Sequence, residues 1–410
     1  MESTIEIKAG YKKTKLGWIP EEWDIHRLGD HIEIRSGSSP SSFSLSDKGK
    51  IPFIKVEDMN NCFKVQNESR FYSNDDRKTI SITSIVFPKR GAAILNNKVR
   101  IVGTPLHMDS NMMALTIISD HIEPNFLYYK LKSLRLSKIA DTSTIPQINN
   151  KHIVPYKLTL PPLPEQKKIA DILSTWDKAI ETTQALINTL QLRKKGLMQQ
   201  LLTGKKRLTG FEGEWEEVKF SDVANRLTKK NEELHDNVVT ISAQRGFIRQ
   251  EDFFNKRVAS KTLSGYYLVD KGDFCYNKSY SKGYPMGAFK RLDDFEKAVV
   301  TTLYICFRLI EEVDSDFMVY YFEGGMLVNN IMKIAQEGGR AHGLLNISLG
   351  DFFGLKMTLP KLEEQTAIAQ VLTAADEEIH QRQNYLEQLQ TQKKGLMQQL
   401  LTGQKRVKIV

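Results

Sequence analysis

The sequence predicts an α+β protein: two globular domains of mixed helix and strand, joined by two long helices. Three observations lead to this fold class. Residues 194–204 recur letter for letter as residues 393–403, an offset of 199 residues. The match continues upstream with many identities, so that residues 160–180 resemble residues 359–379. The stretches between the copies differ from each other and carry mixed strand and helix patterns. The chain is therefore a duplicated unit with a shared helical part and unlike globular parts.

Each repeated segment has the features of one long helix. A proline-rich stretch at 160–164 ends the preceding structure, and no proline follows from Glu165 until well past Gly204. Gly204 is suited to the position just after a helix. This predicts about 38 helical residues, or roughly 57 Å at the rise of an α-helix.

Apolar residues in both helices follow the alternating spacing of four and three that is typical of a coiled coil. We expect the two helices to pair along this stripe in an antiparallel coiled coil with pseudo-two-fold symmetry. The alternative is that each helix packs only on its own domain. The stripe is interrupted at the same places in both copies, at Thr183 and Arg382 and at Lys194 and Lys393. The residues expected to pair are Ile169, Leu173, Trp176, Ile180, Ile187, Leu190, Leu197 and Leu201 in the first copy, and Ile368, Leu372, Ile379, Leu386, Leu389, Leu396 and Leu400 in the second.

The repeat also includes the segments that flank the helices. Residues 16–23 resemble residues 208–215, and Arg406 begins the same passage a third time. This predicts a nearly circular pseudo-symmetry. We expect a first globular domain with its N-terminal linker at 1–160 and a first helix at 161–204. A second globular domain at 205–358 and a second helix with a C-terminal tail at 359–410 complete the prediction.

The globular stretches predict short strands followed by helices. Strand-like runs occupy residues 82–88, 92–95, 238–242 and 299–309, and helical patterns occupy residues 125–140 and 317–335.

Composition restricts the class of protein. The net charge of +9 suggests a polyanionic partner such as nucleic acid. The three cysteines show no spacing typical of a zinc site or a disulfide framework. No apolar run is long enough to span a bilayer and the N-terminus resembles no secretory signal, so we expect a cytoplasmic protein without membrane contact.

No catalytic motif is present. The sequence lacks a phosphate-binding loop, a zinc-protease helix, a hydrolase nucleophile elbow and an adenine-methyltransferase N-P-P-aromatic motif. These absences favour a binding subunit over an enzyme, with no catalytic, cofactor or metal site.

Polar loops that contain Arg, Lys, Asn and Gln are the candidates for contact with DNA, because these side chains bond to base edges and phosphates. The candidates in the first globular stretch are Arg35, Ser36, Lys89, Arg90, Asn96, Asn97, Lys98, Arg100 and Gln147. Those in the second are Gln244, Arg245, Asn277, Lys278, Ser279, Lys282, Arg340 and His342.

The duplicated architecture resembles the specificity subunits of type I restriction-modification systems. Residues 160–166 and the helix that ends at 194–204 carry the resemblance, and residues 359–365 and 393–403 carry it again. Residues 269–274 and 145–149 are also typical of that family.

This resemblance implies that each globular domain reads one half of a bipartite, asymmetric site in double-stranded DNA. The helices would set the gap between the half-sites and recruit two modification subunits, which are adenine-N6 methyltransferases that use S-adenosylmethionine. Restriction subunits that use ATP and magnesium would join the complex, and this chain itself would hold no cofactor.

Two other functions remain open at the level of sequence. The chain could be a coiled-coil adaptor without a role on DNA, although its basic loops and unlike globular parts favour DNA recognition. It could also be an enzyme with an unfamiliar site, which the missing motifs disfavour.

Overall fold

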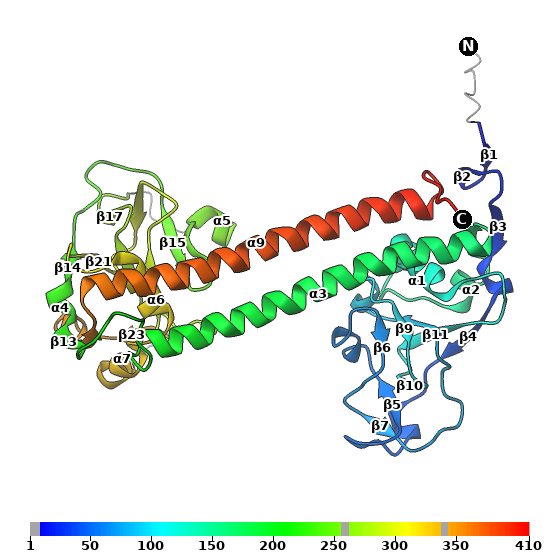
Figure 1. Ribbon diagram of the computed structural model, residues 1–410, viewed down its shortest axis with the longest axis horizontal. Coiled ribbons are helices and arrows are strands. Elements are labelled where there is room, and N and C mark those ends of the chain that lie inside the picture. The colour runs from blue at the N-terminus through cyan, green and yellow to red at the C-terminus, as the bar shows by residue number, and fades with distance from the viewer. Residues whose placement is uncertain (1–8, 256–261, 338–342, 410) are drawn as a thin grey trace, which may run out of the picture. The chain divides into compact units, whose positions relative to one another are not determined.

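The computed structural model describes residues 9–255, 262–337 and 343–409. The chain divides into two compact units. The first unit comprises residues 1–185 and 384–410, and the second comprises residues 186–383. Two long helices, α3 (Leu163–Leu201) and α9 (Leu362–Leu401), each contribute one part to each unit (Figure 1). Both helices predicted from the repeat are confirmed.

Both long helices begin in the same way. Pro164 lies in the first turn of α3, where the missing N–H would have no partner inside the helix. The side chain of Gln166 turns back and donates from Nε2 to the Pro161 carbonyl at 2.9 Å. Gln365 makes the same bond to Pro360 at 2.8 Å. The change from prolines to Lys361 and Glu363 in the second copy therefore leaves the start of the helix intact.

The first unit is built around a five-stranded sheet of order β4-β11-β8-β9-β6. Strands β4 and β8 both pair antiparallel with β11, which lies between them. The strands of this sheet are β4 (Ile32–Ser36), β6 (Val65–Gln66), β8 (Ile85–Pro88), β9 (Arg100–Val102) and β11 (Met112–Ile117). A smaller sheet contains β5 (Ile51–Ile54), β7 (Tyr72–Ser73) and β10 (His107–Met108), and two strand pairs join β1 (Tyr11–Thr14) to β2 (Gly17–Pro20) and β3 (Asp24–Arg27) to β12 (Lys157–Leu160). Helices α1 (Pro124–Leu134) and α2 (Asn150–Ile153) complete the unit.

The core of the first unit joins the sheet to both long helices. Phe87 and Leu115 of the sheet, Phe126 of α1, Leu173 of α3 and Leu400 of α9 belong to one buried cluster. The start of one long helix and the end of the other therefore pack on the same globular core.

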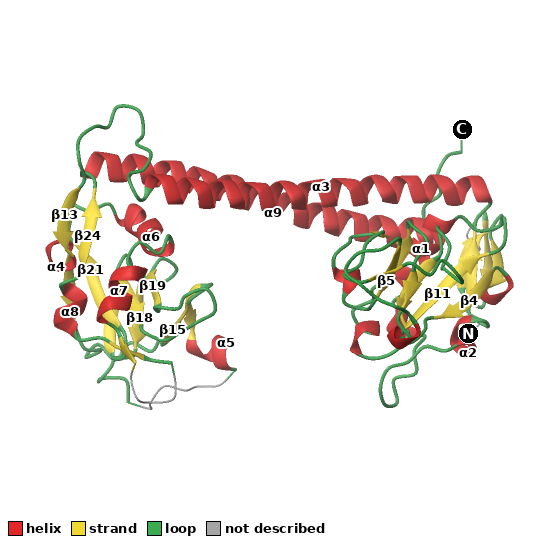
Figure 2. Cartoon of the chain, turned by 90° about the horizontal axis from the view of Figure 1, so that it is seen from below, coloured by secondary structure: helices red, strands yellow, loops and turns green. Residues whose placement is uncertain are grey.

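The second unit has a four-stranded sheet of order β14-β21-β18-β19. Its strands are β14 (Ala224–Leu227), β18 (Phe274–Asn277), β19 (Ala288–Arg291) and β21 (Ile305–Leu309). Four strand pairs surround it: β13 (Glu216–Lys219) with β24 (Lys356–Leu359), β15 (Val239–Ser242) with β16 (Gly246–Arg249), β17 (Tyr267–Asp270) with β20 (Lys297–Val300), and β22 (Gln336–Glu337) with β23 (Leu345–Asn346). The short helices are α4 (Phe220–Val223), α5 (Gln250–Phe254), α6 (Ser315–Glu323), α7 (Val328–Ile334) and α8 (Leu349–Phe353), and α6 packs against β19 (Figure 2).

The core of the second unit is rich in aromatic rings. Phe289 stacks on Phe322 of α6 at 4.3 Å between ring centroids and on Tyr276 at 4.4 Å. Leu201 of α3 and Leu372 of α9 belong to the same buried cluster. The second unit thus repeats the rule of the first, with the ends of the two helices exchanged.

Several local predictions are confirmed and others are wrong in detail. The run at 238–242 forms β15, and that at 82–88 contains β8. The run at 92–95 is not a strand, because residues 92–94 form a turn of 3-10 helix after Gly91. The run at 299–309 is divided between β20 and β21. The helical pattern at 317–335 is divided between α6 and α7 at Gly324 and Gly325, and that at 125–140 ends as a regular α-helix at Leu134.

The apolar stripe of both helices is largely buried. Trp176, Leu197 and Leu396 are half-buried, and the twelve other residues predicted to pair are buried. The residues near the helix ends belong to the two globular cores, whereas Ile180, Ile187, Leu190, Ile379, Leu386 and Leu389 belong to none of the core clusters. The alternative in which each helix packs only on its own domain is therefore wrong, because α3 and α9 each contribute to both globular cores.

The lysines that interrupt the stripe form ion pairs between the helices. In the first unit Lys393 of α9 pairs with the buried Asp177 of α3. In the second unit Lys194 of α3 pairs with Asp376 of α9 at 2.6 Å. The two pairs are related by the offset of 199 residues. Each aspartate also accepts a tyrosine hydroxyl from its own globular part, Tyr129 at 2.5 Å and Tyr320 at 2.9 Å.

A second repeated ion pair closes each unit. Glu165 at the start of α3 is fully buried and receives both Arg406 Nε at 2.7 Å and Arg406 Nη2 at 2.9 Å. Glu364 at the start of α9 receives Arg207 in the same bidentate way, at 2.5 and 2.6 Å. Because Glu165 pairs with Arg406 and Asp177 with Lys393, the segments of α3 and α9 in the first unit run in opposite directions. The same holds in the second unit.

We expect Arg406→Ala to destabilise the first unit by about 2 kcal/mol, because it leaves the buried Glu165 carboxylate without its cation. Arg207→Ala should destabilise the second unit by a similar amount. Unfolding in urea, followed with a fluorescent probe in each unit, measures the two effects separately. Lys405→Ala, which removes an exposed charge next to Arg406, is the control. Equal stability of Arg406→Ala and this control would contradict the prediction.

Candidate nucleic-acid interface

One end of the five-stranded sheet gathers several of the predicted DNA contacts of the first unit. Strands β4 and β8 both end there, and they carry Ser36 and the loop that begins at Lys89. Lys89 Nζ donates to Ser36 Oγ at 2.9 Å. The backbone of Arg90 pairs with that of Gln147, so that a third segment joins the same edge. Residues from three distant parts of the sequence therefore lie together.

The electrostatics of this edge favour an anionic ligand. Arg90 and Ser36 are exposed and Lys89 is half-buried. Burial lowers the pKa of Lys89, and the neighbouring Arg90 lowers it further. Arg35, which precedes this group, is held instead by Glu33, whose Oε1 lies 2.9 Å from Arg35 Nε. Lys89, Arg90 and Gln147 are thus better placed than Arg35 to contact a phosphate or a base.

The other candidates of the first unit lie on the hairpin between β8 and β9 and at the start of β9. Two of them, Asn97 and Arg100, have structural roles. Asn97 adopts a left-handed backbone with φ of 49°. Its side chain donates to the Lys132 carbonyl at 2.7 Å and accepts the Leu136 N–H at 2.9 Å, which ties the hairpin to the end of α1. Asn96 is exposed and Lys98 is half-buried on the same hairpin.

Arg100 is unsuited to contact DNA. Its side chain is buried and donates to the carbonyls of Met59 at 2.6 Å, Val99 at 2.8 Å and Cys62 at 3.1 Å. These bonds satisfy the guanidinium inside the protein and connect the start of β9 to the segment before β6. Arg100, which was predicted as a DNA contact, therefore stabilises the fold instead.

In the second unit, two loops that carry candidates are bonded to each other. Gln244 follows β15, and its Nε2 donates to the Lys282 carbonyl at 3.0 Å. Asn277 ends β18 and accepts the Ser279 N–H at 3.0 Å, while the Lys278 carbonyl accepts the Leu345 N–H at 3.1 Å. Arg245 and Lys282 are exposed, and Lys278 and Ser279 are half-buried. Arg340 and His342 lie outside the described residues.

The loop at 277–282 was predicted as a contact with nucleic acid, and its tyrosine is exposed along with its lysines. Tyr280 lies between Lys278 and Lys282 with 64% of its surface exposed, and its backbone N–H bonds to the Gly343 carbonyl at 2.9 Å. An exposed ring on a held loop suits contact with bases. The ion-pair partners Glu165, Asp177 and Arg406 were not predicted to have a structural role, although each of them recurs at the same offset of 199 residues as the helix.

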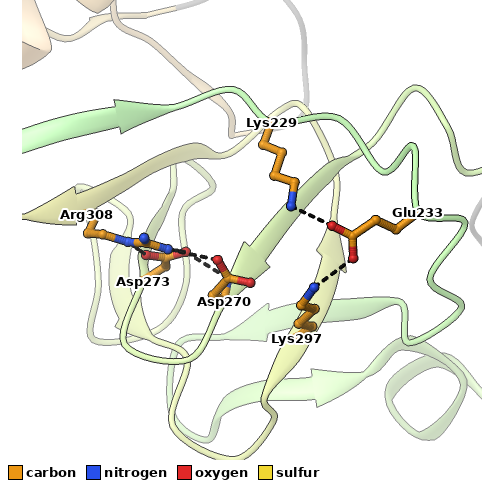
Figure 3. Close-up of polar contacts among 6 residues, drawn as sticks. All are labelled: Lys229, Glu233, Asp270, Asp273, Lys297 and Arg308. Atoms are coloured by element: carbon orange, nitrogen blue, oxygen red, sulfur yellow. Dashed lines mark hydrogen bonds and ion pairs between the residues drawn. The ribbon is translucent and has the colours of Figure 1, made fainter.

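The loop before β18 shows how the second unit holds its strands (Figure 3). Asp273 is buried and accepts Arg308 Nε at 2.6 Å, while Asp270 accepts Arg308 Nη2 at 3.0 Å. Nearby, hydrogen bonds from Lys229 and Lys297 lower the pKa of Glu233 to about 2. Asp270 and Asp273 therefore give the segment 269–274 a structural role in holding β18 and β21 together.

Neither a cluster of metal ligands nor a membrane-spanning helix occurs in the described part of the chain. No group of three or more histidine, cysteine or acidic side chains could hold a metal ion there. Within residues 9–255, 262–337 and 343–409, no helix is long and apolar enough to cross a membrane.

We expect Arg100→Ala to lower the free energy of unfolding by about 2–4 kcal/mol, because it leaves buried carbonyls without a donor. Lys89→Ala removes a half-buried cation at the surface and should change stability by less than about 0.5 kcal/mol. Denaturant unfolding of the two variants measures the difference. A stable Arg100→Ala protein would return this residue to the list of candidate contacts.

Comparison with known proteins identifies the family. The model of the type I restriction modification DNA specificity domain matches the chain twice, at residues 20–192 and 212–390. The putative type I restriction enzyme MjaX specificity subunit of Methanocaldococcus jannaschii is 30% identical and aligns over 97% of both chains. The MjaVIII specificity subunit of the same organism is 26% identical over 95% of this chain and 94% of its own.

Solved structures share the fold. The S subunit of a type I restriction-modification system from M. genitalium has a TM-score of 0.56 at 15% identity, covering 92% of this chain and 96% of its own. A second structure, solved to explain complex assembly and conformational transition of the type I R-M system, has a TM-score of 0.58 at 14% identity. The match covers 94% of this chain and 99% of that chain. The duplicated helices, the two unlike globular parts and the double family match lead to one conclusion: the chain belongs to the type I restriction-modification DNA specificity family and is a DNA-recognition subunit of such a complex.

Proposed function

We propose that the globular part of each unit reads one half of a bipartite, asymmetric sequence in double-stranded DNA. The first would use the edge formed by Ser36, Lys89, Arg90 and Gln147, and the second the bonded loops around Gln244 and Lys282. The two parts differ in their strands and in their polar loops, so the half-sites should differ as well. Arg and Lys on phosphates would supply affinity that depends on salt, whereas contacts with base edges would supply specificity.

The helices α3 and α9 would form an antiparallel coiled coil that sets the gap between the half-sites. The observation that carries this proposal is the pair of repeated ion contacts, Lys393 with Asp177 and Lys194 with Asp376, each within its own unit. The buried stripe residues that belong to no globular core support it, since helices of this length need a partner for such a stripe. A spacer of fixed length predicts a fixed gap.

Two modification subunits would bind equivalent surfaces of the repeated scaffold. Leu186 and Tyr385 occupy the same position in the two copies, and both are exposed, at 40% and 47%. Exposed apolar side chains on a helix favour contact with another protein. The partners would supply S-adenosylmethionine and the methyl transfer, and restriction subunits would supply ATP and magnesium chemistry. This chain would be non-catalytic, with the target adenine flipped into the pocket of the modification subunit.

The first test exchanges residues 24–158 for the corresponding part of another specificity subunit. We expect one half of the methylated sequence to change while the other half and the gap stay the same. Mapping methylated adenines across the genome of a host that expresses each version measures all three. A change in both halves would contradict the independence of the two globular parts.

The second test lengthens both helices by one turn, near Thr183 and near Arg382. We expect the gap between the half-sites to increase while both half-sites are retained, because the coiled coil sets the distance. The same mapping of methylated adenines provides the measurement. An unchanged gap in an active complex would refute the role of the helices as spacer.

A further inference from the structure

We infer that the first unit holds a site for a phosphate group of the DNA backbone, in a pocket between the end of α1 and the last part of α9. This inference rests on the proposed recognition of DNA and adds a contact that does not depend on sequence. The pocket has a volume of about 540 Å³. Its lining includes Phe63, Lys132, Arg135, Lys393, Lys394 and Met397.

The pocket carries more positive charge than its surroundings neutralise. Lys393 forms an ion pair with Asp177, so the charge of this aspartate is already neutralised. In the described part of the chain, Lys132, Arg135 and Lys394 form no ion pair with a carboxylate. Arg135 and Lys394 are exposed, and Lys132 is half-buried. Three cations therefore remain available to an anion at one place.

Among these three cations, Lys132 has a pKa that is lowered strongly by its surroundings. It lies in the last turn of α1. Burial is the largest cause that lowers its pKa, Arg100 of β9 and Lys393 of α9 add to it, and Asp177 of α3 opposes them, so that the pKa is about 8. An anion in the pocket would relieve this repulsion, because an opposite charge favours the protonated ammonium.

The pocket adjoins a segment that we expect to lie near DNA. Asn97 bonds to the Lys132 carbonyl and to the Leu136 N–H, so the hairpin that carries Asn96 and Lys98 is fixed to the pocket wall. A strand of DNA that contacts Lys98 would bring its next phosphates toward Lys132. Lysine and arginine side chains without base partners are suited to such contacts with the backbone.

The second unit provides an internal comparison. Tyr129 and Tyr320 occupy equivalent positions, since each donates to the aspartate that pairs with the lysine of the other helix. In this register Glu323 stands where the first unit has Lys132. Glu323 is neutralised by Lys290 and accepts the Tyr284 hydroxyl at 2.7 Å. The cationic pocket is therefore not a feature of the repeated scaffold, and two identical protein partners on equivalent surfaces would not both find it.

The test replaces Lys132 and Lys394 with glutamine in the complete complex with its modification subunits. Binding is measured across a range of salt to a duplex with the methylated sequence and to a scrambled duplex. We expect affinity for both duplexes to fall by about tenfold and the slope of log affinity against log salt to decrease by about two, since each lost phosphate contact removes about 0.9. The methylated sequence should remain the same.

The control is the double variant Lys138→Gln and Lys195→Gln, which removes an exposed lysine of the first unit outside the pocket and the repeat equivalent of Lys394. If both double variants bind DNA alike, the site is refuted. If the pocket variant loses its modification subunits but keeps its salt slope, the ligand is a partner carboxylate and the inference is wrong. If the unaltered complex does not distinguish the two duplexes, the proposed function fails instead.

A further variant, Lys132→Arg, tests whether the charge of Lys132 itself contributes to DNA binding. Phosphate binding raises the pKa of Lys132, so the unaltered complex takes up a proton when it binds DNA above about pH 8, and its affinity should fall as the pH rises through that value. Arginine keeps its charge, so Lys132→Arg should bind DNA at pH 7 like the unaltered complex and lose this pH dependence. The same pH dependence in both proteins would overturn the role of Lys132.

Discussion

A buried carboxylate at the start of each long helix is the constraint on which the rest of the structure depends. Glu165 and Glu364 are removed from water by the apolar residues around them and would be costly to bury unpaired. Each receives a bidentate arginine that lies just beyond the end of the other helix, Arg406 or Arg207. The beginning of one repeat is thus completed by the end of the other, and neither unit is closed by a single continuous segment.

The same exchange explains why the repeated helix is conserved within the chain while the globular parts differ. Residues 194–204 pack on the core of the second unit, and residues 393–403 pack on the core of the first. Both copies must therefore keep the lysine, the leucines and the glycine. The strands and loops of the globular parts face no such requirement. They are free to carry different polar residues, which the proposed recognition of two unlike half-sites requires.

The proposed DNA-binding surface of the first unit depends on this scaffold in an indirect way. The ends of β4 and β8 are aligned because both pair with β11, and this brings Ser36 and Lys89 together from distant parts of the sequence. The hairpin after β8 is in turn fixed to α1 by Asn97, and Tyr129 of α1 is bonded to Asp177 of α3. Hydrogen bonds therefore connect the hairpin after β8 to α1, and α1 to the long helix α3.

The sequence by itself determined the duplication, both long helices and the family. A letter-for-letter repeat is visible without any structure, and a heptad pattern depends only on residues that are close in sequence. It also placed most candidate contacts in loops. Only the tertiary structure decided which of them can reach a ligand, since Arg100 is buried on carbonyls and Asn97 fixes a hairpin. It also revealed Lys132, which was not predicted and forms no ion pair within the described residues. These outcomes depend on neighbours that are distant in sequence, and burial and charge balance arise only when those neighbours come together.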